Sequence, residues 1–212
     1  MAFAGFTTET FSFYEGLMSD NGKPYWTAHK DDYERHVRGP LAELCADLED
    51  EFGPAKLFRP YRDVRFSKDK TPYKTHQGAH TGEGFYLQVD ADGLMVAGGM
   101  YAPTPEQLRR YRAAVDAGAS GGELQKIVDG LRAAGLEIAG DRLKTRPRGT
   151  PEDHPRLDLL RHRSLYAHRG WPADPWMSDP DEVLARVRDS WRLLRPLVDW
   201  GHEHIGPAES TR

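Results

Sequence analysis

The fold is decided by residues 84–101, which read GFYLQVDADGLMVAGGMY. Apolar and polar side chains alternate at the start of this stretch, which places Phe85, Leu87 and Val89 on one face of a strand. The run Asp-Ala-Asp-Gly that follows is typical of a hairpin turn. The last eight residues supply the return strand. The centre of the chain is therefore predicted to be an antiparallel sheet with one apolar face.

Helical patterns lie on both sides of this hairpin. Apolar residues recur every three to four positions, and Thr104 and Asp179 each precede a Pro, an arrangement that favours a helix start. The predicted class is α+β, with helices packed on an antiparallel sheet in a single domain. We expect this single domain over residues 1–206, with a helical start at 7–52, a sheet-containing centre at 57–101, a helical and mixed part at 104–206, and a tail at 207–212.

Four local expectations refine this outline. Pro40 is expected to break or kink the helical start, because proline lacks an N–H group and its ring clashes with the preceding turn. Residues 61–66 are expected to form a strand, and residues 164–171 an edge strand. Pro196 is expected to end or kink the terminal helix, which leaves residues 202–204 in a tail.

Composition restricts the class of protein. The 212 residues include 38% hydrophobic and 29% charged residues, with a formal net charge of −4. No apolar run approaches the roughly 20 residues that span a bilayer, so we expect no membrane association. The N-terminus lacks the pattern of a secretory signal, and the single cysteine, Cys45, cannot form an intrachain disulfide. We therefore expect a cytoplasmic protein.

The strongest chemical signal lies in residues 59–74, which read RPYRDVRFSKDKTPYK. Three Arg and three Lys stand against two Asp, which leaves a net charge of +4 in a chain of net charge −4. Arginine offers a fixed fork for phosphate or carboxylate, and lysine adds a mobile point charge. The segment therefore predicts a site for an anion.

As a strand, this segment would place Arg59, Asp63 and Arg65 on one face. Asp63 could then orient an arginine through a bidentate contact. Val64 and Phe66 mark the opposite face as the core side.

The candidate site residues form two sets. The candidates for a catalytic role are Asp63, which would orient the arginines, and Tyr73 and His76, either of which could move a proton. The candidates for ligand binding share a positive charge or an aromatic hydroxyl: Arg59, Arg62, Arg65, Lys68, Lys70, Lys74, Tyr86 and Tyr101. Arg62 is also the one that we most expect to be structural, because it would lie on the core face of the strand.

The favoured function is binding of an anionic small molecule that bears phosphate or carboxylate, with or without catalysis. One alternative is binding of single-stranded nucleic acid, with bases stacked on the interleaved Tyr and Phe. The other two alternatives are docking of an acidic partner and a purely structural Arg–Asp network. The net charge of −4 argues against a dedicated nucleic-acid binder.

No cofactor is expected. His76 and His80 stand four apart, as two metal ligands on a helix would. The glycines at 78, 82 and 84 argue against a helix there, and a metal site needs three or four converging ligands. We therefore expect no metal.

The basic segment resembles the hallmark of a bacterial family, domain of unknown function 2461. The pattern is Arg59-x-x-Arg62-Asp63-x-Arg65-Phe66 followed by Asp69-Lys70-x-x-Tyr73-Lys74. Supporting elements are Asn21-Gly22-Lys23, Tyr25-Trp26, Gly99-x-Tyr101, Leu143-Lys144-x-x-Pro147, His154-Pro155 and Leu159-Leu160-Arg161. The resemblance covers nearly the whole chain and implies that these motif positions are shared. It implies no particular reaction.

Overall fold

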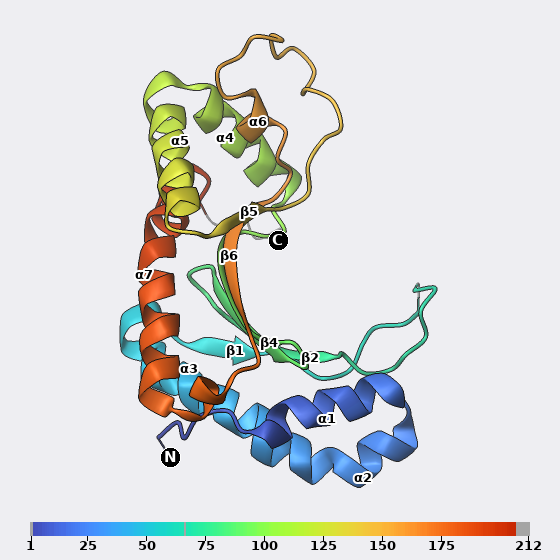
Figure 1. The fold of residues 1–212 in the computed structure, drawn as a ribbon. Coiled ribbons are helices and arrows are strands. Elements are labelled where there is room, and N and C mark those ends of the chain that lie inside the picture. Colours follow the sequence, from blue (N-terminus) through green and yellow to red (C-terminus); the bar gives the residue numbers. More distant parts are fainter. Residues whose placement is uncertain (1, 66, 207–212) are drawn as a thin grey trace. The chain divides into compact units, whose positions relative to one another are not determined.

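A computed structural model describes residues 2–65 and 67–206. The strands form one antiparallel sheet in the order β1-β2-β3-β4-β6-β5, and helices pack with it, so the α+β class is confirmed (Figure 1). In chain order the strands are β1 (Ala55–Leu57), β2 (His76–Thr81), β3 (Phe85–Asp90), β4 (Gly93–Met100), β5 (Glu137–Ala139) and β6 (Leu165–Pro172).

The helices of the described residues flank the strands along the chain. They are α1 (Thr8–Ser19), α2 (Lys23–Tyr33), the π-helical η1 (Glu34–Arg38), α3 (Gly39–Phe52), α4 (Pro105–Asp116), α5 (Gly118–Ala133), α6 (Leu157–Leu160), the 3-10 helix η2 (Pro175–Ser178) and α7 (Pro180–His204). In this part of the chain, no helix combines the length and the apolar character needed to cross a membrane.

The chain folds into two compact units. Unit 1 comprises the described residues up to Val96 together with Gly170–Ser190, and unit 2 comprises Ala97–Arg169 and the described residues from Trp191 onward.

In unit 1, helices α1 and α3 pack against one face of the sheet (Figure 1). The predicted alternation in β3 is confirmed, because Phe85, Leu87 and Val89 are fully buried. The Phe85 ring lies 5.2 Å from Phe52 of α3, edge to face. Tyr86 and its alternate neighbours on β3 are only half-buried, so the other face of the sheet is open to polar side chains.

The strand expected over residues 61–66 is wrong for the described residues 61–65. Residues 59–65 and 67–74 instead lie in a projecting loop between β1 and β2, which we call the arm (Figure 1). Only its base is paired: Tyr61 bridges Tyr73, and the Arg62 N–H donates to the Pro72 carbonyl at 2.8 Å. Prolines in both halves remove ladder donors, and no neighbouring strand pairs with residues 63–65.

The expected core face of this segment is also not found. Val64 is only half-buried, and Phe66 lies outside the described residues.

The break expected at Pro40 does not occur. The helical run passes from α2 to α3 through η1, where the Gly39 N–H donates to the Glu34 carbonyl in a π-type turn. Pro40 then falls in the first turn of α3, where its missing N–H would have no intrahelical partner.

Two expectations about the C-terminal part are wrong as well. Strand β6 lies between β4 and β5 and is therefore not an edge strand. Helix α7 continues through Pro196 to His204, so residues 202–204 belong to the helix. The apolar side chains around Pro196, among them Leu194 and Trp200, are buried, and this burial outweighs the hydrogen bond that the proline removes. The expected tail, residues 207–212, lies outside the described residues.

Unit 2 builds its own core from α4, α5 and the end of α7. The Tyr111 ring of α4 meets the Trp200 ring of α7 edge to face at 6.1 Å, and the Trp200 indole N–H donates to the Ser120 carbonyl at 3.0 Å. The predicted start of α4 is confirmed. The Thr104 hydroxyl accepts from the Gln107 N–H at 3.2 Å, and the Gln107 side chain accepts from the Thr104 N–H at 3.0 Å.

Candidate functional site

Asn21, in the turn between α1 and α2, clamps one end of the arm. Its amide donates to the Tyr73 carbonyl and accepts from the Tyr73 N–H, each at 3.0 Å. The Tyr73 ring stacks on Trp26 at 4.5 Å and 11° and is 6% exposed. Burial raises the pKa of Tyr73. Tyr73 therefore anchors the arm, a role that differs from the proton transfer suggested by the sequence.

A second buried amide fixes the other end of the arm. The Gln77 side chain donates to the Phe58 carbonyl at 2.8 Å and accepts a hydrogen bond from the Tyr33 hydroxyl of α2. Gln77 is 1% exposed and Tyr33 is equally buried. Both ends of the arm are thus held by side-chain amides on unit 1, which fixes where the arm leaves the sheet.

Within the arm, Arg62 closes the loop. Its guanidinium contacts the Asp69 carboxylate and the Thr71 hydroxyl. Asp69 also accepts from the Thr71 N–H at 2.9 Å, and these contacts hold its pKa down at about 2. These contacts tie Arg62 into a loop, whereas the strand whose core face it was expected to occupy is not found.

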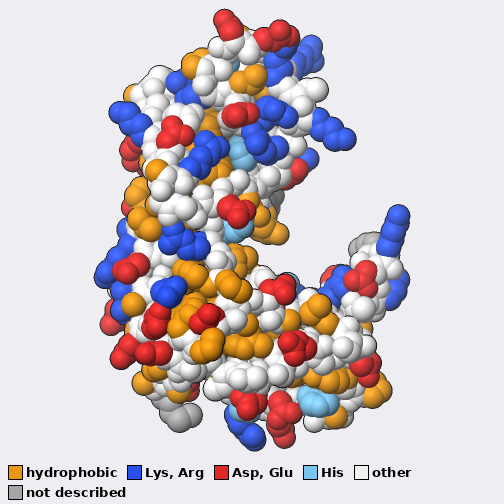
Figure 2. Space-filling model, viewed as in Figure 1, with side chains coloured by type: hydrophobic (Ala, Val, Ile, Leu, Met, Phe, Trp, Pro, Cys, Tyr) orange, Lys and Arg blue, Asp and Glu red, His pale blue; other side chains and the backbone are white. Residues whose placement is uncertain are grey.

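Two further charged side chains of the arm, Arg65 and Lys70, also bind groups within it. Arg65 makes the predicted bidentate contact with Asp63, at 3.0 and 2.7 Å, and this contact lowers the pKa of Asp63. Lys70 donates to the Val64 carbonyl at 3.0 Å. Figure 2 shows basic and acidic side chains side by side on the arm. These contacts therefore stabilise the arm. They do not direct the side chains of Asp63, Arg65 or Lys70 toward the open face of the sheet.

The register of β2 and β3 brings polar residues together on the open face of unit 1. His76 pairs with Asp90, Gly78 with Gln88, and His80 with Tyr86. Because alternate residues share a face, these six side-chain positions lie on the side opposite the buried Phe85 face. The sequence reasoning missed this surface, although the spacing His76-x-Gly78-x-His80 is that of a strand.

A row of hydrogen bonds crosses this face along β3. The Tyr86 hydroxyl donates to the side-chain oxygen (Oε1) of Gln88 at 2.7 Å, and the side-chain N–H of Gln88 donates to the Asp90 carboxylate at 2.7 Å. The Tyr86 ring lies over Gly78, where an added Cβ would stand 2.5 Å from the tyrosine oxygen. Only a glycine at 78 leaves room for this ring position.

Positive groups gather where the arm returns to β2. The Lys74 ammonium lies 4.9 Å above the Phe58 ring, which itself stacks on His80 at 5.2 Å. Burial lowers the pKa of Lys74, and the nearby charge of Arg59 lowers it further. Burial and then Lys74 lower the pKa of His76. We call Arg59, Lys74 and His76 the basic end.

Arg59 and Lys74, the two residues of the basic end that belong to the arm, differ from its other arginines in ion pairing. Among the described residues, neither Arg59 nor Lys74 forms an ion pair, whereas Arg62 and Arg65 each do. The nearest negative group that acts on His76 is Asp90, which raises its pKa less than Lys74 lowers it.

Two further candidates lie elsewhere. Lys68 is exposed in the middle of the arm. Tyr101 belongs to unit 2, one residue beyond β4, where it is 76% exposed and its ring lies 5.7 Å from that of Tyr166. Of the candidates named from the sequence, unit 1 brings Lys74, His76 and Tyr86 to its open face, and Arg59 lies close enough to Lys74 to lower its pKa.

A hollow of about 370 Å³ adjoins this face at the β3–β4 turn. It lies within unit 1 and is lined by Gln88, Asp90, Asp92, Gly93, Leu94, Met95, Gly170, Trp171 and Pro172. Asp90 thus belongs both to the polar row on β3 and to the wall of the hollow.

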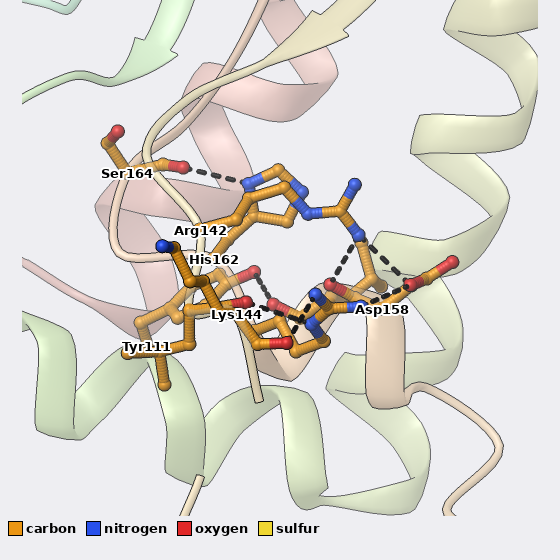
Figure 3. A network of polar contacts seen from close by, with 9 residues as sticks. Tyr111, Arg142, Lys144, Asp158, His162 and Ser164 are labelled. Atoms are coloured by element: carbon orange, nitrogen blue, oxygen red, sulfur yellow. Dashed lines mark hydrogen bonds and ion pairs between the residues drawn. The ribbon is translucent and has the colours of Figure 1, made fainter. Parts of the chain in front are cut away.

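In unit 2, basic side chains around α6 make a set of internal contacts (Figure 3). Arg161 donates to the carbonyls of Leu143 and Lys144, each at 3.0 Å. Arg142 donates to the Asp158 carboxylate at 3.0 Å. These contacts fasten the long segment before α6 to the helix itself.

Two more residues of that segment hold it to α4. Arg156 donates to the Val115 carbonyl at 2.7 Å and to the Asp116 carbonyl at 2.9 Å, at the end of the helix. His154 lies 3.2 Å from the Asp116 carboxylate. His154 and Arg161, two of the motif residues of unit 2, therefore help to hold this segment in place.

Comparison with known proteins gives a family and no activity. The model of one family, described as "Conserved hypothetical protein (DUF2461)", matches residues 9–200. No curated protein matches the chain. With nearly its whole length matched, the chain belongs to the DUF2461 family of conserved hypothetical proteins.

Proposed function

We propose that unit 1 binds an anionic small molecule, bearing phosphate or carboxylate, at the basic end. The observation that supports this best is the contrast in pairing: Arg62 and Arg65 are neutralised within the arm, whereas Arg59 and Lys74 are not. Positive groups held close together disfavour one another, and a bound anion removes that cost. An arginine fork beside a lysine suits a phosphate or carboxylate group.

His76 is the residue of the basic end best suited to proton transfer. Its pKa lies below the usual value of 6.5, so the imidazole is largely neutral at pH 7 and can accept a proton. The open face also places Tyr86 and Asp90 nearby on the neighbouring strand. If the bound compound reacts, we assign the proton transfer to His76, in place of Tyr73.

Binding of single-stranded nucleic acid is a second proposal with less support. Bases stack on open ring faces, and the Tyr73 ring is covered by Trp26. The exposed Lys68 and Arg65 on the arm are the features that favour this proposal. Docking of an acidic partner rests on the same exposed charges.

The pH dependence of sulfate binding tests the first proposal. Sulfate keeps its charge of −2 between pH 6 and 8, so a change in affinity reports on the protein. A bound anion favours the protonated form of His76 and raises its pKa, so binding takes up a proton and strengthens as the pH falls. We expect about 3- to 10-fold tighter binding at pH 6 than at pH 8, measured by calorimetric titration.

The His76→Gln variant is expected to lose most of this pH dependence, while His29→Gln on α2 keeps it. No sulfate binding at either pH, or equal affinity at both in the unaltered protein, would contradict the proposal.

A further inference from the structure

The hollow beside the β3–β4 turn adjoins the proposed anion site. Asp90 lines the hollow and is the cross-strand partner of His76, one of the three residues of the basic end. Directly paired residues of an antiparallel sheet lie about 4.5–5.5 Å apart, so one ligand can reach both places. The assignment of such a ligand to the hollow rests on the proposed anion binding.

The hollow combines an apolar wall with hydrogen-bond acceptors. Trp171 and Met95 contribute apolar surface, and the Trp171 ring is held edge to face against Trp176 at 6.1 Å. Asp90 contributes a carboxylate. Such a surface suits a flat ring that carries N–H groups, because the ring packs on apolar side chains and its N–H groups need acceptors.

The direction of the hydrogen bonds on β3 supports the same chemistry. The Tyr86 hydroxyl donates a hydrogen bond to Gln88, and the Gln88 side chain donates one to Asp90. The row ends in the Asp90 carboxylate, which also accepts from the Asp92 and Gly93 N–H groups at 2.9 and 3.2 Å and donates no hydrogen bond when ionised. A ligand group that bonds to Asp90 in the hollow must therefore be a donor.

We propose that the anionic ligand carries a planar nitrogen heterocycle, as a nucleoside monophosphate does. The heterocycle occupies the hollow against Trp171, with its N–H donors toward Asp90, and the phosphate lies at the basic end. A volume of about 370 Å³ accommodates a ring of this size together with part of the group that links it to the phosphate.

A matched set of ligands tests this assignment. The four ribonucleoside 5′-monophosphates are titrated against ribose 5-phosphate, which has the same sugar and phosphate without the ring. At least one nucleotide is expected to bind 10-fold or more tightly than ribose 5-phosphate, in line with the gain from stacking one base. Equal affinities would overturn the ring assignment and leave anion binding standing. No binding of sulfate, ribose 5-phosphate or nucleotide would overturn the proposed function itself.

Variants locate the two parts of the ligand. Asp90→Asn and Trp171→Ala are expected to reduce nucleotide affinity to that of ribose 5-phosphate, while ribose 5-phosphate affinity stays within about 3-fold. Lys74→Met is expected to weaken both ligands. Asp31→Asn on α2 makes the same charge change as Asp90→Asn away from the site and should alter neither. If Trp171→Ala lowers the thermal midpoint of unfolding, Asp90→Asn alone decides. Equal loss of both ligands in Asp90→Asn would overturn the ring assignment.

Discussion

A variant carrying both Arg59→Ala and Lys74→Met is expected to bind sulfate at least about 100-fold more weakly than the unaltered protein. A hydrogen bond to a charged group contributes about 1.5–3 kcal/mol, and this variant removes at least two such donors. Calorimetric titration at pH 6 measures the loss.

The stability of this variant should change little. Arg59 is exposed and forms no ion pair among the described residues, and Lys74 contributes a contact with the Phe58 ring. We expect the free energy of unfolding to stay within about 1 kcal/mol of the parent value. An unchanged free energy of unfolding would show that the loss of sulfate binding does not result from unfolding.

Arg65→Ala is the matched control for this variant. It removes one positive charge from the same arm, where the double variant removes two, and the Arg65 side chain is 77% exposed and held by Asp63. Sulfate affinity should stay within about 3-fold of the parent value. If Arg65→Ala weakens binding as much as the double variant does, the anion lies along the arm, and the assignment to the basic end is wrong.

The substitution Trp26→Ala is expected to destabilise unit 1 by about 3–5 kcal/mol. Trp26 is 5% exposed, stacks on Tyr73 at 4.5 Å, and packs against Tyr33 at 4.9 Å and Phe13 at 6.2 Å. Removing the indole leaves a cavity in this aromatic cluster and takes away the surface on which the arm rests. Urea unfolding monitored by circular dichroism measures the change.

Tyr61→Ala is the control within the same aromatic cluster. Its ring lies 5.9 Å from Trp26 but is 48% exposed, so its removal should cost less than about 1.5 kcal/mol. Equal destabilisation by the two substitutions would show that the arm is not anchored through Trp26 and Tyr73.

The sheet and most helices could be predicted because local pattern and tertiary packing agree. The alternation of Phe85, Leu87 and Val89 identifies the buried face of β3, and the residues after it form the turn that the sequence indicates. The capping pair Thr104 and Gln107 likewise identifies the start of α4 without any information from elsewhere in the chain.

The arm could not be predicted in the same way. Residues 59–65 have the alternation of a strand. A strand also needs a neighbouring strand to pair with, and the sequence alone does not tell whether there is one. What fixes the arm comes from far along the chain: Asn21 reaches Tyr73 over 52 positions, and Tyr33 reaches Gln77 over 44. Contacts of this length carry no local signal.

The motif that identifies the family now has a physical interpretation. Arg62 with Asp69, and Arg65 with Asp63, tie the arm together, and Tyr73 fastens it to Trp26. Most charges in the motif are therefore structural, contrary to the simplest interpretation of a basic segment. Under our proposal the anion binds Arg59 and Lys74, at the two ends of the motif, neither of which forms an ion pair among the described residues.

The central claim is that an anion binds at the basic end, and locating one tests it most directly. Crystals soaked in tungstate, an electron-dense oxyanion, would show the position by anomalous scattering. We expect a tungstate oxygen within hydrogen-bond distance of the Lys74 ammonium, with the Arg59 guanidinium or the His76 imidazole as a second partner. Tungstate bound only to other residues of the arm, or no site in unit 1, would contradict it.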